Sequence, residues 1–107
     1  KVDKQAIIAD MLELLQGTLD AHVLDEGGDA VRATPELVLI GETAAVSSMA
    51  LVSFIADVES TLQEKNNLTV TLVSERALSR KKSPFRSVDA LAEYVVELVE
   101  NPAEISA

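Results

Sequence analysis

The sequence predicts an all-α domain, a four-helix bundle of three longer helices and one short one, with a long loop between the first two. Three segments repeat apolar residues at the 3.6-residue period of a helix. The chain of 107 residues is 48% hydrophobic, which is enough for one packed core and too apolar for a disordered chain. We therefore expect a single domain over 1–107, with its core over about 3–101 and a frayed tail over 102–107.

The first long helix is expected from residue 4 to about residue 19, with Asp3 as its N-cap. Its apolar stripe has spacings of three, four and four and consists of Ile8, Met11, Leu15 and Leu19. The polar side chains of Asp10, Glu13 and Gln16 are expected on its outer face. Residues 20–46 should be irregular, because the run Gly27-Gly28-Asp29 breaks helices. A loop this long is often functional.

The second long helix is expected from Ser48 to about Lys65, with Ser47 or Ser48 as its N-cap. Its stripe consists of Leu51, Ile55, Val58 and Leu62. The segment after it, Leu68–Val73, alternates like a strand. Because one strand has no partner in this sequence, we expect an extended connector that buries Leu68, Val70 and Leu72.

A short helix is expected over residues 74–79, capped by Ser74, and a basic loop over residues 80–86. Ser87 should cap a final helix that runs to about Glu100 and buries Val88, Leu91, Val95 and Leu98. The dipeptide Asn101-Pro102 ends this helix, because the residue before a proline disfavours helical geometry.

The charge and the composition of the chain argue against several classes of function. The net charge of −9 argues against sequence-independent binding to nucleic acid or to an anionic membrane. The chain has no cysteine, which excludes disulfides, thiolate zinc sites and cysteine nucleophiles. No apolar run or signal peptide indicates membrane insertion or export. One basic island, from Arg76 to Arg86, interrupts the acidic chain. Its simplest interpretation is a solvated loop; the alternatives are pairing with the acidic helices and contact with an acidic partner.

No catalytic constellation or metal site is evident, so we do not expect an enzyme. His22 has no cysteine or carboxylate at ligand spacing, and Asp25, Glu26 and Asp29 lack the spacing of a calcium loop.

The most informative residue is Ser48, at the start of the second long helix. A phosphate on its hydroxyl would meet unpaired backbone N–H groups and the positive end of the helix dipole. The simpler interpretation of Ser48 is a helix cap.

These elements, taken in order, resemble the acyl carrier protein family. The resemblance rests on Ser48-Met49 opening an acidic helix, on apolar Val52, Phe54 and Ile55 after it, and on the closing segment 87–95. It covers nearly the whole chain. The chain departs from the family at Ser47, where the family has aspartate, and at Ser53, where many members have an acidic residue. Gly41 also lies further upstream of the serine than is typical, and the basic island 76–86 is unusual for this family.

The resemblance implies that Ser48 carries a covalent 4'-phosphopantetheine and holds an acyl intermediate as a thioester. It implies a monomeric, cytoplasmic protein of fatty-acid, lipid or secondary-metabolite synthesis. The expected partners are a phosphopantetheinyl transferase and acyl-processing enzymes, which would dock on Met49, Asp57 and Glu59. Two alternatives remain: a helical interaction domain of carrier fold without a prosthetic group, which Ser47 favours, and a carrier domain excised from a larger synthase.

Overall fold

Three α-helices form in the computed structural model, which describes residues 3–74, 77 and 81–100. They are α1 (Lys4–Glu26), α2 (Ser48–Asn66) and α4 (Val88–Glu100). No β-strand occurs in these residues. The all-α class predicted from the sequence is therefore confirmed for the described part of the chain.

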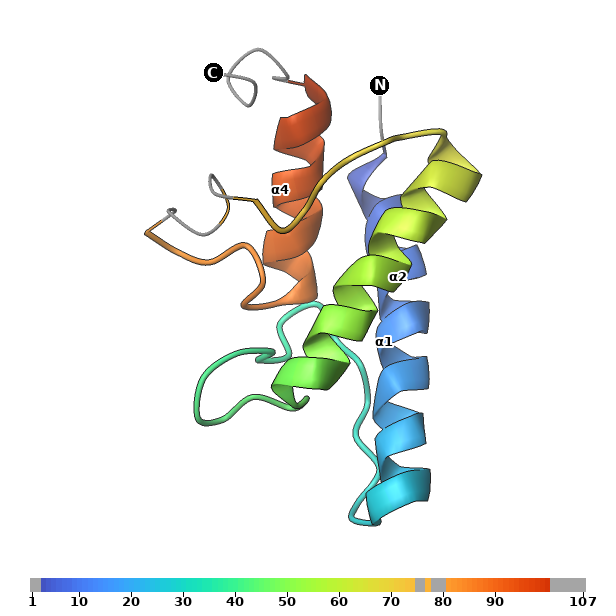
Figure 1. Cartoon of the computed structure of the whole chain (residues 1–107), viewed down its shortest axis with the longest axis vertical. Coiled ribbons are helices and arrows are strands. Elements are labelled where there is room, and N and C mark those ends of the chain that lie inside the picture. Colours follow the sequence, from blue (N-terminus) through green and yellow to red (C-terminus); the bar gives the residue numbers. More distant parts are fainter. Residues whose placement is uncertain (1–2, 75–76, 78–80, 101–107) are drawn as a thin grey trace.

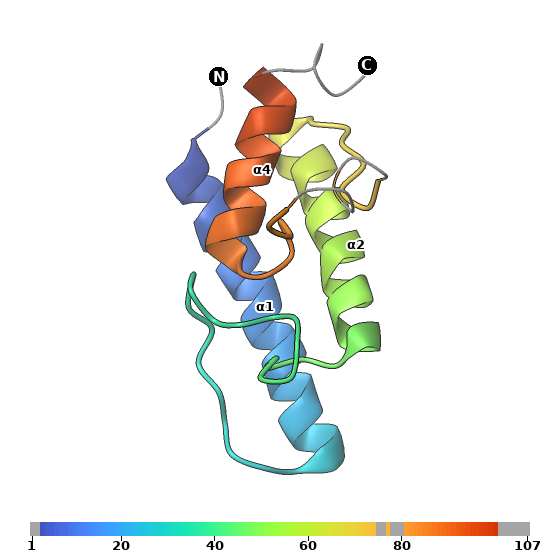
Figure 2. The same ribbon diagram turned by 90° about the vertical axis from the view of Figure 1, so that its left-hand side faces the viewer.

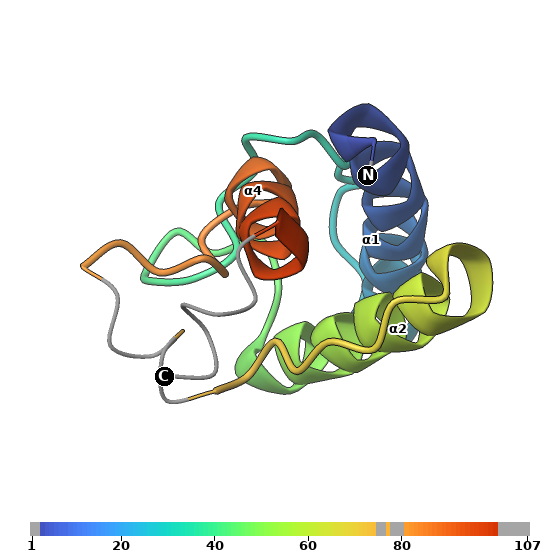
Figure 3. The same ribbon diagram turned by 90° about the horizontal axis from the view of Figure 1, so that it is seen from above.

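The central element is α1, which packs against both α2 and α4. In Figure 1, α1 descends while α2 and α4 ascend, so that each of them runs opposite to α1. Figure 2 shows that the loop between α1 and α2 returns along α1. Viewed from above in Figure 3, α2 crosses α1, and α4 lies on the side of the molecule where the loops are.

The core is mostly aliphatic and includes three buried aromatic residues: Phe54 of α2, Phe85, and Tyr94 of α4. Phe54 and Tyr94 are at most 1% exposed. Around them pack the apolar stripes of the three helices, among them Ile7, Met11, Leu15, Val58, Leu62, Leu91 and Val95. Because these side chains form a single cluster, the three helices share one hydrophobic core.

The predicted helix starts are confirmed by capping hydrogen bonds. The Asp3 carboxylate accepts from the backbone N–H groups of Gln5 and Ala6. The Ser87 hydroxyl accepts from the Ala90 N–H at 3.1 Å. Such caps satisfy N–H groups that have no partner within the first turn of a helix.

The predicted end of the first helix, near residue 19, is wrong. The helix continues to Glu26 and ends at Gly27, whose φ of 81° lies in a region that favours glycine. Leu24 is 85% exposed, so the last turns of α1 project beyond the core. The buried stripe therefore stops at Leu19, earlier than the helix does, and a prediction based on the stripe stopped there too.

Of the segment 20–46 that was predicted to be irregular, residues 20–26 belong to α1 and the rest is irregular; the loop over residues 27–47 is attached to the bundle at several points. Leu39 is buried in the core, and its N–H donates to the Arg86 carbonyl at 3.0 Å. The N–H of Asp89, in the first turn of α4, donates to the Pro35 carbonyl at 2.9 Å. This loop carbonyl satisfies an N–H group that α4 itself cannot pair.

After α2, residues 68–73 form the expected connector. Leu72 is fully buried, while Leu68 and Val70 are half-buried. The short helix expected over 74–79 falls mostly outside the described residues, so a four-helix bundle is not established. Of that segment, Ser74 accepts a hydrogen bond from the buried Ala77 at 3.2 Å. The expected tail over 102–107 also lies outside the described residues.

Among the described residues, two sets of ion pairs join the helices. Lys65 of α2 pairs with Asp10 of α1 at 3.1 Å, and Lys4 of α1 pairs with Asp89 and Glu93 of α4. The hydrogen bond and the charge of Asp10 raise the pKa of Lys65 above its ordinary value of 10.5. None of the helices in the described residues combines the length and apolarity that a membrane span requires.

Candidate functional site

The two serines at the start of α2 have different environments. Ser47 is the N-cap, and its hydroxyl accepts from the Ala50 N–H at 3.1 Å. Ser48 is the first helical residue and is exposed. Of the two serines that the sequence offered as the N-cap, Ser47 therefore takes that role, and Ser48 is left exposed.

The first turn of α2 also presents unpaired backbone donors. The N–H groups of Ala50 and Leu51 are used by the side chain and the carbonyl of Ser47. Within the described residues, the N–H groups of Ser48 and Met49 make no hydrogen bond. The first turn contains no acidic residue. A phosphate at Ser48 would therefore meet two N–H groups and the positive end of the helix dipole without a local anion to repel it.

Beside Ser48, α2 exposes two large apolar side chains, Met49 at 83% and Val52 at 64%. The neighbouring Phe54 and Ile55 face the core and are nearly fully buried. Asp57 is exposed further along the helix. The outer face of α2 thus combines an apolar start with a carboxylate, while the opposite face packs inside the molecule.

Glu59, which the sequence suggested as a docking residue, makes a contact within the fold. It is half-buried, and its Oε2 accepts from the Leu72 N–H at 2.7 Å. This bond holds the connector against α2. Its docking role stays a prediction, but the structural role was not visible in the sequence, because Leu72 lies 13 positions away in a segment without regular structure.

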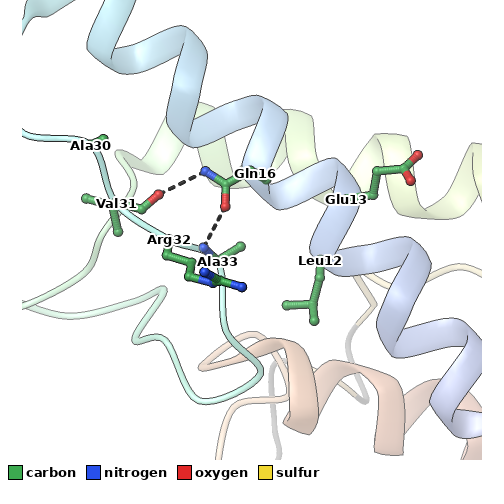
Figure 4. Close-up of a pocket in the computed structure, with 7 residues that line it drawn as sticks. All are labelled: Leu12, Glu13, Gln16, Ala30, Val31, Arg32 and Ala33. Carbon is green, nitrogen blue, oxygen red and sulfur yellow. Dashed lines mark hydrogen bonds between the residues drawn. The ribbon is translucent and has the colours of Figure 1, made fainter.

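Gln16 is a second residue whose role the sequence did not reveal. Expected on the outer face of α1, it is half-buried and binds the loop. Its side-chain nitrogen donates to the Val31 carbonyl at 2.9 Å, and its oxygen accepts from the Ala33 N–H at 2.8 Å (Figure 4). These contacts line an open groove of about 570 Å³ between α1 and residues 30–33. Because both polar atoms of the Gln16 side chain bind the loop, this groove is better explained as the place where the loop packs on α1 than as a ligand site.

The structure does not bring the described residues of the remaining candidates together into a chemical site. Among the residues that the structure describes, no group of three His, Asp or Glu side chains is arranged to hold a metal ion. Of the basic island, Arg76 and Arg80 lie outside the described residues, Lys81 and Lys82 are exposed, and Arg86 donates to the Ser83 carbonyl at 2.6 Å.

Comparison with models of known protein families, with curated proteins and with solved structures finds no match. The function must therefore be argued from the residues at the start of α2 and from their surroundings.

Proposed function

We propose that this protein is an acyl carrier whose Ser48 bears a covalent 4'-phosphopantetheine arm. The proposal rests on the observation that the two serines have different roles at the start of α2. Ser47 supplies the helix cap, so the exposed Ser48 hydroxyl is not required for capping. A hydroxyl at this position is accessible to a modifying enzyme.

The residues around Ser48 fit a phosphodiester. The unpaired N–H groups of Ser48 and Met49 and the helix dipole favour negative charge there, by about 0.3–1 kcal/mol at an exposed site. When bound, the arm supplies a terminal thiol on which an acyl group is held as a thioester. The chain has no cysteine of its own that would compete in thiol exchange.

The outer face of α2 is the proposed docking surface for partner enzymes. Exposed Met49 and Val52 offer apolar contacts next to the attachment point. Asp57 and the net charge of −9 favour partners with basic surfaces, mainly by accelerating association. We further propose that the protein is a cytoplasmic monomer. Its partners would be the phosphopantetheinyl transferase that modifies it and acyl-processing enzymes of fatty-acid, lipid or secondary-metabolite synthesis.

The attachment is tested by incubating the purified protein with coenzyme A and a broad-specificity phosphopantetheinyl transferase, followed by intact and peptide mass spectrometry. A gain of about 340 Da, located on Ser48, is expected. Ser48→Ala should abolish the gain, whereas Ser47→Ala should retain most of it. Labelling that survives Ser48→Ala would show that another residue is modified.

The same experiment separates the proposal from its main alternative, a helical interaction domain without a prosthetic group. Ser47 stands where carrier proteins have an aspartate, and this substitution favours the alternative. If no transferase from the source organism labels the wild-type protein, the interaction domain becomes the better description.

The docking surface is tested by association kinetics with a transferase that labels the wild type. Asp57→Lys should slow association several-fold at low salt, with the difference shrinking as salt is added. Asp25→Lys is the matched control, because it makes the same change in net charge at an exposed residue in the last turns of α1. Equal effects of both variants would show that net charge, rather than this face of α2, guides the partner.

A further inference from the structure

The basic island ends in a turn over residues 81–86, which we call the basic turn. It reads Lys-Lys-Ser-Pro-Phe-Arg and leads through the Ser87 cap into α4. In Figures 1 and 3 this segment, in orange, stands at the edge of the molecule, on the far side of α4 from α1. Lys81, Lys82 and Arg86 are exposed. The turn therefore presents three cations to solvent on an otherwise acidic protein.

The basic turn is anchored in the core, unlike a loop that is merely solvated. Pro84 is fully buried, and Phe85 is 7% exposed. The Ser83 hydroxyl accepts from the Phe85 N–H at 3.1 Å, and the Ser83 carbonyl accepts from the Arg86 N–H at 3.4 Å. The Arg86 carbonyl accepts from the Leu39 N–H at 3.0 Å. The backbone of this turn is therefore fixed before any partner binds, which lowers the entropy that binding must remove.

The cations of the basic turn are not neutralised by the acids of the described residues. Two lysines on the helices have carboxylate partners, but within the described part of the chain Lys81, Lys82 and Arg86 form no ion pair. The Arg86 guanidinium instead donates from Nη1 to the Ser83 carbonyl at 2.6 Å. This bond uses one of its five N–H groups and restrains the planar group. The remaining donors can accommodate both oxygens of a carboxylate.

Charge selects the occupant of the basic turn. The segment 76–86 has five bases and no acid, whereas the rest of the chain has 18 acids and four bases, a net of −14. A long polyanion or an anionic membrane would extend from the turn over these acidic surfaces and be repelled. A second copy of this chain would add its own net charge of −9, which also opposes association. A short run of carboxylates on another protein contacts the turn alone.

We propose that the basic turn docks an acidic segment of a partner protein. One carboxylate of that segment pairs with the Arg86 guanidinium, and others lie near Lys81 and Lys82. This surface is opposite in charge to the one proposed on α2, so the two attract different chemistry. The proposal goes beyond the attachment of a prosthetic group and does not depend on modification of Ser48.

The test uses the unmodified, ¹⁵N-labelled protein and a capped seven-residue synthetic peptide of alternating glutamate and alanine. A salt concentration of about 0.1 M is chosen because its Debye length of about 10 Å screens the distant acidic surfaces. Titration followed by NMR should give saturable shifts at the amides of Lys82, Ser83 and Arg86, with a Kd below about 1 mM. The same peptide with glutamine in place of glutamate should give no saturable shift. Binding of the glutamate peptide should be lost at about 1 M salt.

Variants of the protein locate the binding surface. Arg86→Lys keeps the charge but removes the planar fork, and it should weaken binding about fivefold. Lys82→Gln removes one charge and should weaken binding several-fold. Arg32→Gln is the matched control, because it removes one charge at an exposed residue of the long loop, and it should change binding less than about twofold. Unchanged amide shifts in α1 and α2 verify that each variant is folded.

Four results would overturn the proposal. The first is the absence of saturable shifts up to about 1 mM glutamate peptide. The second is an equal loss of binding in Lys82→Gln and Arg32→Gln, because net charge rather than the basic turn would then attract the peptide. The third is tighter binding of a short single-stranded DNA than of the peptide, which would make nucleic acid the occupant. The fourth is a concentration-dependent dimer in sedimentation that Lys82→Gln abolishes, which would make a second copy the occupant.

Discussion

At the scale of single residues, Ser47 contributes to stability through one hydrogen bond at the start of α2. Ser47→Ala should lower the free energy of unfolding by about 1 kcal/mol, the usual cost of losing an N-cap. Ser48→Ala should change it by less than about 0.5 kcal/mol, because this exposed side chain does not cap the helix. Urea denaturation of both variants measures the difference. Equal losses would mean that Ser48 has a structural role.

Glu59 is the second residue with a specific structural role. Glu59→Ala removes the acceptor for the N–H group of Leu72, a residue whose side chain is fully buried. Because that N–H group loses its partner, the substitution should lower the free energy of unfolding by about 1–3 kcal/mol. Glu59→Gln keeps an oxygen acceptor and should lose less. Asp57→Ala, at an exposed position two residues earlier, serves as the control and should stay within about 0.5 kcal/mol.

Hydrogen exchange at Leu72 provides a second measurement of the same contact. Its protection should fall in Glu59→Ala and be largely retained in Glu59→Gln. If both variants unfold like the wild type and keep this protection, the carboxylate does not hold the connector.

Residue-level prediction from the sequence succeeded where the interaction is local. The serine cap of α2 involves residues three positions apart, so its chemistry can be recognised in the sequence. The contacts of Glu59 and Gln16 join helices to irregular segments 13 to 17 positions away. Their partners depend on the path of the chain in three dimensions, and no periodic pattern encodes that path.

At the scale of elements, Gln16 fastens the loop over 27–47 to α1. Gln16→Ala should raise the hydrogen-exchange rate at Ala33 by about tenfold, as expected for the loss of about 1.4 kcal/mol of local protection. Exchange in α2 and α4 should not change. Glu13→Ala, one turn earlier on α1, is the control. An unaffected Ala33 in Gln16→Ala would show that Leu39 and the contacts to α4 suffice to hold the loop.

The ion pair between α1 and α2 should make stability depend on alkaline pH. Asp10 raises the pKa of Lys65 in the folded protein above its ordinary value of 10.5. The stabilisation is therefore complete below the unfolded-state pKa and is lost as the pH rises through the folded-state pKa. The stability difference between the wild type and Lys65→Gln should accordingly shrink as the pH rises above 10.5, the ordinary pKa of lysine.

Thermal unfolding of both proteins across this pH range, at fixed low salt, measures the difference. Because the two proteins differ at residue 65 alone, the pH dependence that they share cancels in the comparison. A difference that stays constant with pH would mean that the pair contributes nothing through its charge.

The boundaries of the elements show what a pattern of hydrophobic residues can report. Helix starts were predicted well, because Asp3, Ser47 and Ser87 carry the capping chemistry in their own side chains. The end of α1 was predicted seven residues too early, because an apolar stripe reports burial and not helical conformation. The helix continues past its last buried residue, Leu19, until Gly27 allows a different backbone conformation.

At the scale of the whole molecule, one shared core predicts cooperative unfolding. Phe54→Ala should remove about 3–5 kcal/mol, a large part of the roughly 5–15 kcal/mol typical of such domains. Phe54→Leu should lose less, because most of the volume stays filled. Denaturation should follow a single transition by circular dichroism and by NMR signals from all three helices. Separate transitions for α2 and α4 would show that their packing against α1 is independent.

The all-α class was predictable because three periodic segments dominate the chain, and composition alone indicated one core. The central position of α1 was not predictable, because periodicity identifies the buried face of a helix and not its neighbours. The same limit applies to the candidate site. The sequence indicated Ser48 as the candidate attachment residue. The exposure of Met49 and Val52 next to it was not predictable, because it depends on which face of α2 packs against α1.

The burial of Tyr94 gives this protein an internal spectroscopic probe. It is the single tyrosine of a chain without tryptophan, and its ring lies in the core on α4. Its near-ultraviolet absorption and emission therefore report on the packing around one known ring, without any attached dye. Loosening of α4 should be visible in that signal, whereas attachment of a group at the exposed Ser48 that leaves the core intact should be nearly silent. For the acyl carrier proposed above, tyrosine emission would thus show whether the acyl chain stays in solvent or enters the interior of the bundle.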